Sequence, residues 1–570
     1  MSKMVMVCFK EKPRIDQIIY KLNKMNERLI PDNIKESKPN ILSPNPKLLM
    51  AVYSQNSTVL QSPDNAAICL GTVFGNSNWE KPGLQAPDGT YALIRSNDKY
   101  VEAVSDMIGS RTIWYYMDQD KFIVSTSQRA IIMLVGSFEL NEKVIPWMLS
   151  AGNLGPSLSW DKRIQCLPPN SIASLNRNEW RLNVSTSTAV FDATEQTTQE
   201  HTIRLEKAIQ ETFNDINIKP DQWVIPLSGG YDSRALLLFL KEKYNLETIT
   251  WGTESSLSMK HSDSQIAKEL SEYLGIKNSF FLLDKKDISA KTILNRFIQN
   301  GEGRIDHLSG YVDGFDLWKM LHERGIKGII RGDVPWPTSY PMDEKDLRRI
   351  LGLSLWTDYI NLPHPTQFDI PDQDFPEEFS KKENESLGGL RNRLYQNVRM
   401  PLILAALNDL KTPYIELTNP FLSRKIIEVT RSLPENLLKD KQLFKEIINK
   451  HSPAIGYAKY SANEENGDIL QKESMKELLI EEITHNGDSV FSDTYLTFIL
   501  NKLRNQDNTV RVNYIKRIKS LISPYISKRF KAQIRNHVTK QNMDFNVLAF
   551  RSVIIIKMKQ LLQEDMKFLR

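Results

Sequence analysis

The chain has 570 residues, a length that predicts two or three domains. Its residues are 41% hydrophobic and 25% charged, which is the composition of a soluble globular protein. No apolar run approaches the roughly 20 residues that a membrane-spanning helix needs, and no signal peptide is recognisable. Three scattered cysteines exclude a disulfide framework or a zinc site and favour a cytoplasmic location.

The net charge of +5 is unevenly distributed, because residues 501–570 hold 16 Lys and Arg against 4 Asp and Glu. Such a tail could meet nucleic acid or a membrane surface. Its basic residues alternate with apolar ones at helical spacing, however, which favours the solvated face of helices that close a domain. We therefore expect no membrane partner, and nucleic acid is disfavoured.

Residues 1–190 are dominated by short strand patterns separated by turn residues. Strands at this spacing predict an antiparallel layered domain. The clearest segments are 90–96, 100–106, 112–118 and 121–127. A polar, Thr-rich stretch follows, and we place a linker at residues 191–205 within it.

From residue 201 onward, strands alternate with helices, a pattern that predicts a parallel sheet with right-handed crossovers. The expected helices are 201–214, 233–244 and 262–275, and the expected strands are 222–227, 247–253 and 279–283. Residues 340–570 are mainly helical in pattern. The predicted fold class is therefore α/β, with a second domain over 206–470 and a basic helical extension over 471–570.

The segment VIPLSGGYDSRALLLFL, residues 224–240, contains the strongest chemical motif. A buried strand is followed by Ser228-Gly229-Gly230-Tyr231, and a helix begins near Asp232-Ser233. Two glycines let backbone N–H groups approach an anion, and a helix N-terminus favours negative charge. The serine hydroxyls can donate hydrogen bonds, and Asp232 is suited to hold Mg²⁺ on phosphate oxygens.

A strand–turn–helix connection capped by Asp and Ser would explain a Gly-Gly turn without any ligand. The complete S-G-G-x-D-S, placed between an apolar strand and an apolar helix, favours a phosphate site instead. The position also fits, because open α/β sheets bind ligands at the carboxyl ends of their strands. No G-x-x-x-x-G-K-[ST] occurs, so the loop is not of the Walker type.

The hexapeptide resembles the pyrophosphate loop of N-type ATP pyrophosphatases, and residues 85–465 resemble the asparagine synthetase family. The segments that carry this resemblance are PDGTYALI, SDMIGSRTIWYY and RIQCLPPNSIASL in the first half, then TWGTES, DSQIAKELSEYLGI and NPFLSRKIIEVTRSLPENL. The resemblance implies a glutaminase-like N-terminal domain and a synthetase domain that cleaves ATP to AMP and pyrophosphate through an acyl-adenylate.

The first half departs from the family at its catalytic cysteine. The family's glutaminases carry a cysteine directly after the initiator Met, where this chain has Ser2. The nearest thiol, Cys8, lies inside a predicted strand, without the activating base that a thiol nucleophile needs. The family's N-G-E tripeptide is also missing, with GTVFGNSNW near its place. We therefore expect a degenerate domain without glutaminase activity, retained as a packing platform.

The metal motif of the family, G-(E/D)-G-x-D-E, is also altered. Here the predicted strand at 325–330 is followed by RGDVPWPTSY, which aligns Asp333 with the metal-binding Asp and Val334 with the following Glu. The resemblance implies that Asp232 and Asp333 hold Mg²⁺. It further implies that Lys459, in the loop GYAKYSA, stabilises charge on the α-phosphate. Trp251, Gly252 and Thr253 would hold the adenine of ATP through backbone groups.

The predicted activity is an ATP-dependent amide ligase that activates a small-molecule or peptide carboxylate for attack by ammonia or an amine. Family members without the N-terminal cysteine include β-lactam synthetase and the lasso-peptide cyclases, so a ring-closing enzyme is the main alternative. An enzyme that amidates a sugar carboxylate, a tRNA-modifying ATP pyrophosphatase and a non-catalytic descendant also stay open. A homodimer is compatible with the sequence.

Overall fold

The computed structural model describes residues 3–505 and 541–570, except residues 36, 54–58, 63, 65, 76–77 and 338–339. Ser2 and much of the basic tail, residues 506–540, lie outside the described residues. Among the described helices, none is both long and apolar enough to cross a membrane.

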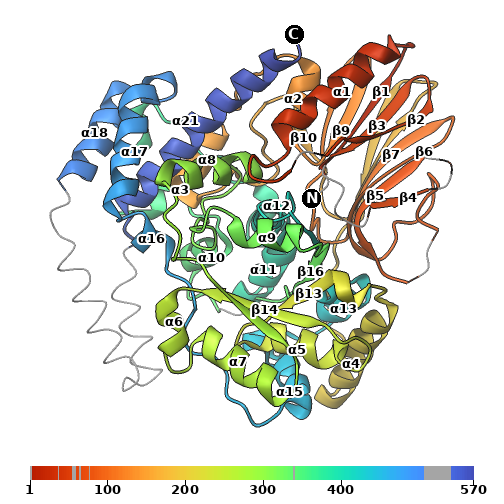
Figure 1. Cartoon of the computed structure of the whole chain (residues 1–570), viewed down its shortest axis with the longest axis vertical. Helices are drawn as coiled ribbons and strands as arrows, with labels where there is room; N and C mark the ends of the chain where they lie inside the picture. Colours follow the sequence, from red (N-terminus) through yellow and green to blue (C-terminus); the bar gives the residue numbers. More distant parts are fainter. Residues whose placement is uncertain are drawn as a thin grey trace.

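Two antiparallel six-stranded sheets form the N-terminal region (Figure 1). The first has the order β10-β8-β9-β1-β3-β2, with β1 Lys3–Phe9, β2 Asn40–Asn45, β3 Leu48–Tyr53, β8 Trp114–Met117, β9 Lys121–Ser125 and β10 Gln165–Cys166. The second has the order β12-β11-β7-β6-β5-β4, with β4 Val59–Gln61, β5 Ala67–Val73, β6 Gly89–Ser96, β7 Tyr100–Ser105, β11 Ser171–Asn176 and β12 Arg181–Thr186.

The two sheets face each other across a shared apolar core, because successive side chains of a strand point to opposite faces. Met6 and Val124 of the first sheet share this core with Ile94 and Ala103 of the second. The other face of the first sheet, which includes Val5, is covered by helices α1 Ile15–Leu29 and α2 Gln128–Val135. The N-terminal region is therefore layered, as predicted.

A five-stranded parallel sheet follows in the order β15-β14-β13-β16-β17. Its strands are β13 Trp223–Pro226, β14 Glu247–Gly252, β15 Asn278–Leu282, β16 Gly328–Ile330 and β17 Glu416–Thr418, and all four neighbouring pairs are parallel. Val224 and Ile225 point to different cores on the two faces of the sheet. The predicted α/β fold class is confirmed.

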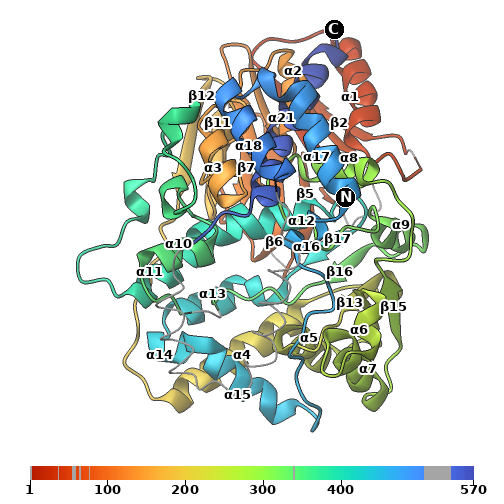
Figure 2. The ribbon, with the colours of Figure 1, turned by 90° about the vertical axis from the view of Figure 1, so that its left-hand side faces the viewer.

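Helices cover both faces of the parallel sheet. One core contains α4 Thr198–Asp215, α5 Tyr231–Leu240, α7 Asp263–Tyr273 and α15 Gln442–His451, and the other contains α8 Ala290–Gly301 and α9 Asp316–Glu323. Figure 2 shows α4, α5, α7 and α15 together beyond one side of the sheet. The remaining α-helices described between residues 140 and 470 are α3 Val144–Ala151, α6 Glu254–Ser258, α10 Glu344–Leu351, α11 Leu387–Leu394, α12 Ala405–Asp409, α13 Arg424–Arg431, α14 Glu435–Leu438 and α16 Asn466–Ile469, and a π-helix spans Tyr395–Leu404.

The C-terminal helices are part of the body of the molecule. Helix α21, Phe545–Phe568, packs against α2, α3, α17 Glu473–Asn486 and α18 Asp493–Arg504 (Figures 1 and 2). Near its end, the fully buried carboxylate of Asp565 accepts hydrogen bonds from Arg129 Nε at 2.6 Å and Arg28 Nε at 2.9 Å. Helix α21, which lies in the predicted C-terminal extension, is thereby attached to the N-terminal region.

The predicted strands and helices are found with small shifts at their ends. Helix α4 begins at Thr198, inside the predicted linker, because Thr197 and Glu200 form a capping box at its start. Strand β17 was not predicted, since three residues within a helical region show no alternation.

Candidate active site at the carboxyl edge of the parallel sheet

The S-G-G-Y-D-S loop connects the end of β13 to the start of α5, as the motif predicted. Its two serines close the loop on itself: Ser228 N donates to Ser233 Oγ at 3.0 Å, and the two hydroxyls lie 2.9 Å apart. The backbone N–H of Leu227 bonds Ile249 O at 2.7 Å, which fixes the loop to the neighbouring strand β14. The loop is therefore rigidly attached to the edge of the sheet.

A carboxylate already meets one backbone amide of this loop. Gly229 N–H donates to Oδ1 of Asp263 at 3.1 Å, and Asp263 is the first residue of α7. Burial raises the pKa of Asp263, while the backbone N–H groups of Gly229 and Ala462 act to lower it. The Gly229 amide thus points where an anion can lie, and that place is taken by a side chain of the protein.

A chain segment, residues 455–463, covers the loop, and we call it the covering segment. Arg234 of α5 donates to the carbonyl oxygens of Ile455 at 2.9 Å and Gly456 at 2.6 Å. The ring of Tyr457 stacks on Tyr231 with centroids 3.7 Å apart, and the Arg234 guanidinium lies 3.9 Å from the same ring. These contacts fasten the covering segment onto the first turn of α5.

The covering segment also lies over both strand ends that were predicted to hold ATP. Ala458 N donates to Gly229 O at 3.0 Å, and Thr253 N donates to Ala462 O at 2.9 Å. A Cβ added to Gly229 would lie 2.4 Å from the Cβ of Ala458, and one added to Gly252 would lie 2.6 Å from the Cβ of Ala462. Glycine is therefore required at both positions for this close approach.

The side chains of Trp251 and Lys459 do not contact the S-G-G-Y-D-S loop in the described contacts. The ring of Trp251 contacts that of Trp318 edge-on at 5.3 Å, so it packs toward the core beneath the sheet edge. Lys459 lies in the covering segment, where its backbone N–H bonds His261 O at 2.9 Å and its side chain is exposed. The Lys459 ammonium forms no ion pair with any side chain in the described part of the chain.

Asp232 is paired with a lysine that the sequence motif did not reveal. Nζ of Lys441, the residue before α15, lies 2.5 Å from Asp232 Oδ2. The other oxygen, Oδ1, is buried and has no hydrogen-bond partner among the described residues. Burial raises the pKa of Asp232, and Asp333 adds to this, whereas Lys441 opposes it. An unpartnered carboxylate oxygen of this kind fits a metal ligand.

Asp333 follows β16 and is held by its neighbour Arg331. Arg331 Nε and Nη2 donate to its two carboxylate oxygens at 2.8 and 2.9 Å, and the Asn419 amide can donate to Oδ2 at 2.9 Å. Burial acts to raise the pKa of Asp333, but Arg331 holds it below its ordinary value. Both Asp333 oxygens are thus engaged, and Asp333 fits a metal ligand only after Arg331 shares or releases one.

The structure brings the two predicted carboxylates to one cavity of about 210 Å³. Asp232, Asp333 and Lys441 line it on the side of the sheet edge, and residues of the π-helix line it as well. Backbone packing is tight here, since a Cβ on Gly332 would lie 2.9 Å from the carbonyl oxygen of Asp232. In the described part of the chain no three His, Cys, Asp or Glu side chains gather as a metal site, so Mg²⁺ would need phosphate or water oxygens too.

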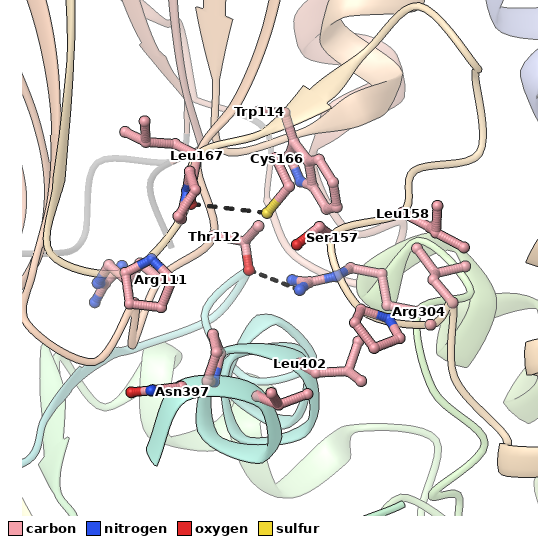
Figure 3. A pocket seen from close by; sticks show the side chains of 18 of the residues that line it. Arg111, Thr112, Trp114, Ser157, Leu158, Cys166, Leu167, Arg304, Asn397 and Leu402 are labelled. Atoms are coloured by element: carbon pink, nitrogen blue, oxygen red, sulfur yellow. Dashed lines mark hydrogen bonds between the residues drawn. The ribbon is translucent and has the colours of Figure 1, made fainter. Parts of the chain in front are cut away.

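A second cavity, of about 50 Å³, lies where the N-terminal sheets meet the π-helix (Figure 3). Arg304 donates to Thr112 Oγ1 at 2.6 Å across this space, with Cys166 nearby and Asn397 of the π-helix on the opposite wall. Burial raises the pKa of Cys166 to about 11, so its thiol stays protonated at neutral pH. The π-helix therefore contributes to the walls of both cavities.

The N-terminal region presents no activated thiol among its described residues. Cys8 lies in β1 and is fully buried, as predicted, and burial raises its pKa to about 11. Cys69 is likewise buried, with its pKa raised to about 12. The thiolate, which is the nucleophile in cysteine catalysis, is therefore absent at neutral pH from all three cysteines. The Ser2 position of the family's catalytic cysteine lies outside the described residues.

No protein-family model matches the chain, and no curated protein matches it in sequence. Over half of its length the chain is structurally similar to a glutamine phosphoribosylpyrophosphate amidotransferase from B. subtilis, complexed with ADP and GMP, with a TM-score of 0.20 and 10% identity. That match covers 50% of this chain and 94% of the other. A structure of the allosteric regulatory enzyme of purine biosynthesis matches with a TM-score of 0.22 and 11% identity, over 60% of this chain and 82% of the other. Structural matches with such low TM-scores and sequence identities do not indicate an activity for this chain.

Proposed function

We propose that this protein is an ATP-dependent amide-forming ligase that activates a carboxylic acid by adenylation. The observation that carries the proposal is the shared cavity of Asp232 and Asp333 beside the S-G-G-Y-D-S loop, at the carboxyl edge of a parallel sheet. Phosphate binding is favoured at such an edge because glycine amides and a helix N-terminus converge there. The buried, unpartnered oxygen of Asp232 adds a ligand for the Mg²⁺ that accompanies ATP.

In the proposed reaction, an oxygen of the substrate carboxylate bonds to the α-phosphorus of ATP while the bond to pyrophosphate breaks. Lys441 lies beside Asp232 and would neutralise charge on the departing pyrophosphate. Mg²⁺, held by Asp232 and Asp333, would supply further charge neutralisation. An amine nitrogen then attacks the activated carbonyl, AMP leaves, and the nitrogen loses a proton. Lys459 would reach the phosphates only if its exposed side chain turned inward.

The nitrogen donor in this proposal is ammonia or an amine, since the thiolate that cysteine-dependent glutamine hydrolysis needs is not provided by the described residues. All three thiols are held protonated by burial. An amine carried by the substrate itself would make the enzyme a ring-closing synthetase. Both variants share the adenylation step and differ in whether added ammonia is required.

Release of pyrophosphate from Mg-ATP tests the proposal. The purified wild type is compared with Asp232→Ala over a panel of carboxylic acids, and each acid is tested alone, with ammonia and with glutamine. Acid-dependent release by the wild type, lost in the variant, supports adenylation. Independence from ammonia would favour ring closure, and stimulation by glutamine would contradict the absence of glutaminase activity from the N-terminal region. If the wild type bound no Mg-ATP, as measured by calorimetry, the proposal would fail.

A further inference from the structure

Arg399 lines the Asp232–Asp333 cavity from the π-helix. This helix spans ten residues, Tyr395–Leu404, and contains Pro401. π-Helical turns are rare and concentrate at functional sites because the wider turn changes where side chains point. In this case the altered helix contributes Tyr395 and Arg399 to the same cavity as the two predicted metal ligands.

The Arg399 guanidinium forms no hydrogen bond or ion pair with any residue in the described parts of the chain. Two other arginines at the sheet edge do have partners: the partly buried Arg331 binds Asp333, and the fully buried Arg234 binds two carbonyl oxygens of the covering segment. Arg399 is itself only partly exposed, and burial lowers its pKa. Its head lies near Gly352, where an added Cβ would be 3.6 Å from Nη1.

Leaving a partly buried guanidinium without an acceptor costs free energy, because the lost hydration is not replaced. The carboxylates that share the cavity do not pair with Arg399: Asp333 binds Arg331, Asp232 binds Lys441 through Oδ2, and the proposed function assigns the remaining Oδ1 of Asp232 to Mg²⁺. A ligand with a negatively charged group would supply the hydrogen-bond acceptor that the described residues do not give to Arg399. Arginine is well suited to this role, since its fork of donors matches a carboxylate.

The rest of the cavity is mainly apolar. The side chains that complete the lining belong to Val334, Trp336, Met400, Ile403, Leu404 and Leu407. Tyr395 supplies a hydroxyl, which donates to Val334 O at 3.4 Å. Oδ1 of Asp232 is the one unpartnered carboxylate oxygen among the described lining side chains, and the proposed function assigns it to Mg²⁺, which leaves no carboxylate oxygen of the lining for an ammonium group. The volume, about 210 Å³, is smaller than the roughly 300–1,000 Å³ of sites for drug-sized ligands, which indicates a small ligand.

We propose that Arg399 binds a second, non-reacting carboxylate of the substrate, and that the substrate class is a small aliphatic dicarboxylic acid without an α-ammonium group. One carboxylate meets Arg399, the hydrocarbon body lies against the apolar lining, and the other carboxylate reaches the proposed adenylation site at Asp232. This inference rests on the proposed function and adds its substrate class and a specificity-determining residue.

Calorimetric titration of the full chain tests the inference, with adipate and pimelate compared with hexanoate and heptanoate, which lack the second carboxylate, and with aspartate, which adds an ammonium group. We expect adipate or pimelate to bind at least about tenfold more tightly than the monocarboxylates and aspartate, since a site that bonds a charged group rejects ligands without it. Arg399→Gln should remove this preference, and Arg399→Lys should keep part of it.

Arg349→Gln is the matched control, because Arg349 lies exposed on α10 and pairs only with Asp346 among described residues. It should leave the preference unchanged. Equal binding of mono- and dicarboxylates, a preference for aspartate, an unchanged preference in Arg399→Gln, or no binding of either diacid would each overturn the inference. Titration with Mg-ATP separates this inference from the proposed function. If the wild type binds no Mg-ATP, the proposed function fails. If it binds Mg-ATP but shows no preference for diacids, only the inference about Arg399 is rejected.

Discussion

Nζ of Lys441 lies 2.5 Å from Oδ2 of Asp232, so a cation from the start of α15 holds the carboxylate at the centre of the candidate site. Lys441 acts to lower the pKa of Asp232, against the effect of burial. Lys441 therefore opposes the effect of burial, which favours the protonated carboxyl. The structure supplies this partner, and the motif around Asp232 does not indicate it.

Lys441→Met should raise the pKa of Asp232 further, because burial then acts without its main opposing charge. Pyrophosphate release should fall by at least about tenfold at neutral pH, since one charged contact of about 1.4 kcal/mol corresponds to that factor. The acid limb of the pH profile should move to higher pH. Lys450→Met, which changes an exposed lysine of α15, is the control and should alter neither the rate nor the acid limb. An unmoved acid limb in Lys441→Met would contradict this role.

The two glycines of the loop should respond differently to alanine. A Cβ on Gly229 would lie 2.4 Å from the Ala458 Cβ and 2.8 Å from the Ile266 Cβ, whereas one on Gly230 would meet only Ser228 Oγ, at 3.4 Å. Gly229→Ala should cost about 1–3 kcal/mol, as overpacking does, while Gly230→Ala should stay within about 0.5 kcal/mol. Urea unfolding of both variants measures the difference, and equal costs would argue against the close packing of the covering segment.

The covering segment must move for ATP to lie on the loop, because Ala458 and Ala462 contact Gly229 and Gly252 directly. Tyr457→Ala removes the stacking on Tyr231 and should free the segment. We expect faster proteolysis within residues 455–463 in the absence of nucleotide, and several-fold tighter binding of Mg-ATP, since less free energy is spent on opening. Tyr460→Ala, an exposed tyrosine of the same segment, is the control. Weaker ATP binding in Tyr457→Ala would show that the tyrosine contacts the nucleotide instead.

The order of strands and helices around the parallel sheet could be predicted because each carries its own periodicity. Strand β13 is an apolar run, and α5 follows directly with a continuous apolar face. Strand β17 could not be predicted, since its three residues are defined by pairing with β16 and by burial, neither of which shows in local pattern. Helix α21 lies where the sequence predicted helices that close a domain, but its contacts with α2 and α3 could not be predicted, because they join segments far apart in the chain.

The part of the candidate site that lies in contiguous sequence motifs could be predicted, and the rest could not. Asp232 and Asp333, which the family resemblance pairs as ligands of Mg²⁺, line one cavity, and their role as metal ligands stays a prediction. Lys441, Asp263 and Arg399 reach the same edge from α15, α7 and the π-helix, so their roles depend on packing between distant segments. Sequence spacing contains no information about such contacts.

Asp313 should make stability depend on pH. Its buried carboxylate accepts from the backbone N–H groups of Phe315 at 3.1 Å and Leu317 at 2.8 Å, and burial raises its pKa from 3.8 to about 6. Because the folded-state pKa is the higher one, the stability gained by protonation is present below pH 4 and lost as pH rises through about 6. Relative to Asp313→Asn, the wild type should lose about 3 kcal/mol between pH 4 and pH 7.5. A difference independent of pH in urea unfolding would contradict this.

Helix α21 should contribute to stability through one buried ion pair. Arg551 Nε donates to Asp306 Oδ2 at 2.7 Å, and its Nη1 donates to the carbonyl oxygens of Leu149 and Ser150. Arg551→Leu would leave the Asp306 carboxylate buried without this partner, which costs about 3–5 kcal/mol. The double variant with Asp306→Asn should cost less than the sum of the two single variants, because no charge is left unpaired.

The same pair gives a pH test with the opposite sign to that of Asp313. Burial alone would raise the pKa of Asp306, but Arg551 and His307 hold it at about 2, below the ordinary 3.8. Its stabilisation is therefore present above pH 4 and lost as pH falls toward 2, so the cost of Arg551→Leu should shrink over that range. Lys143→Leu, which breaks an exposed pair with Asp374, should cost no more than about 0.5 kcal/mol. If Arg551→Leu cost as little as Lys143→Leu at pH 7, α21 would not be anchored by this contact.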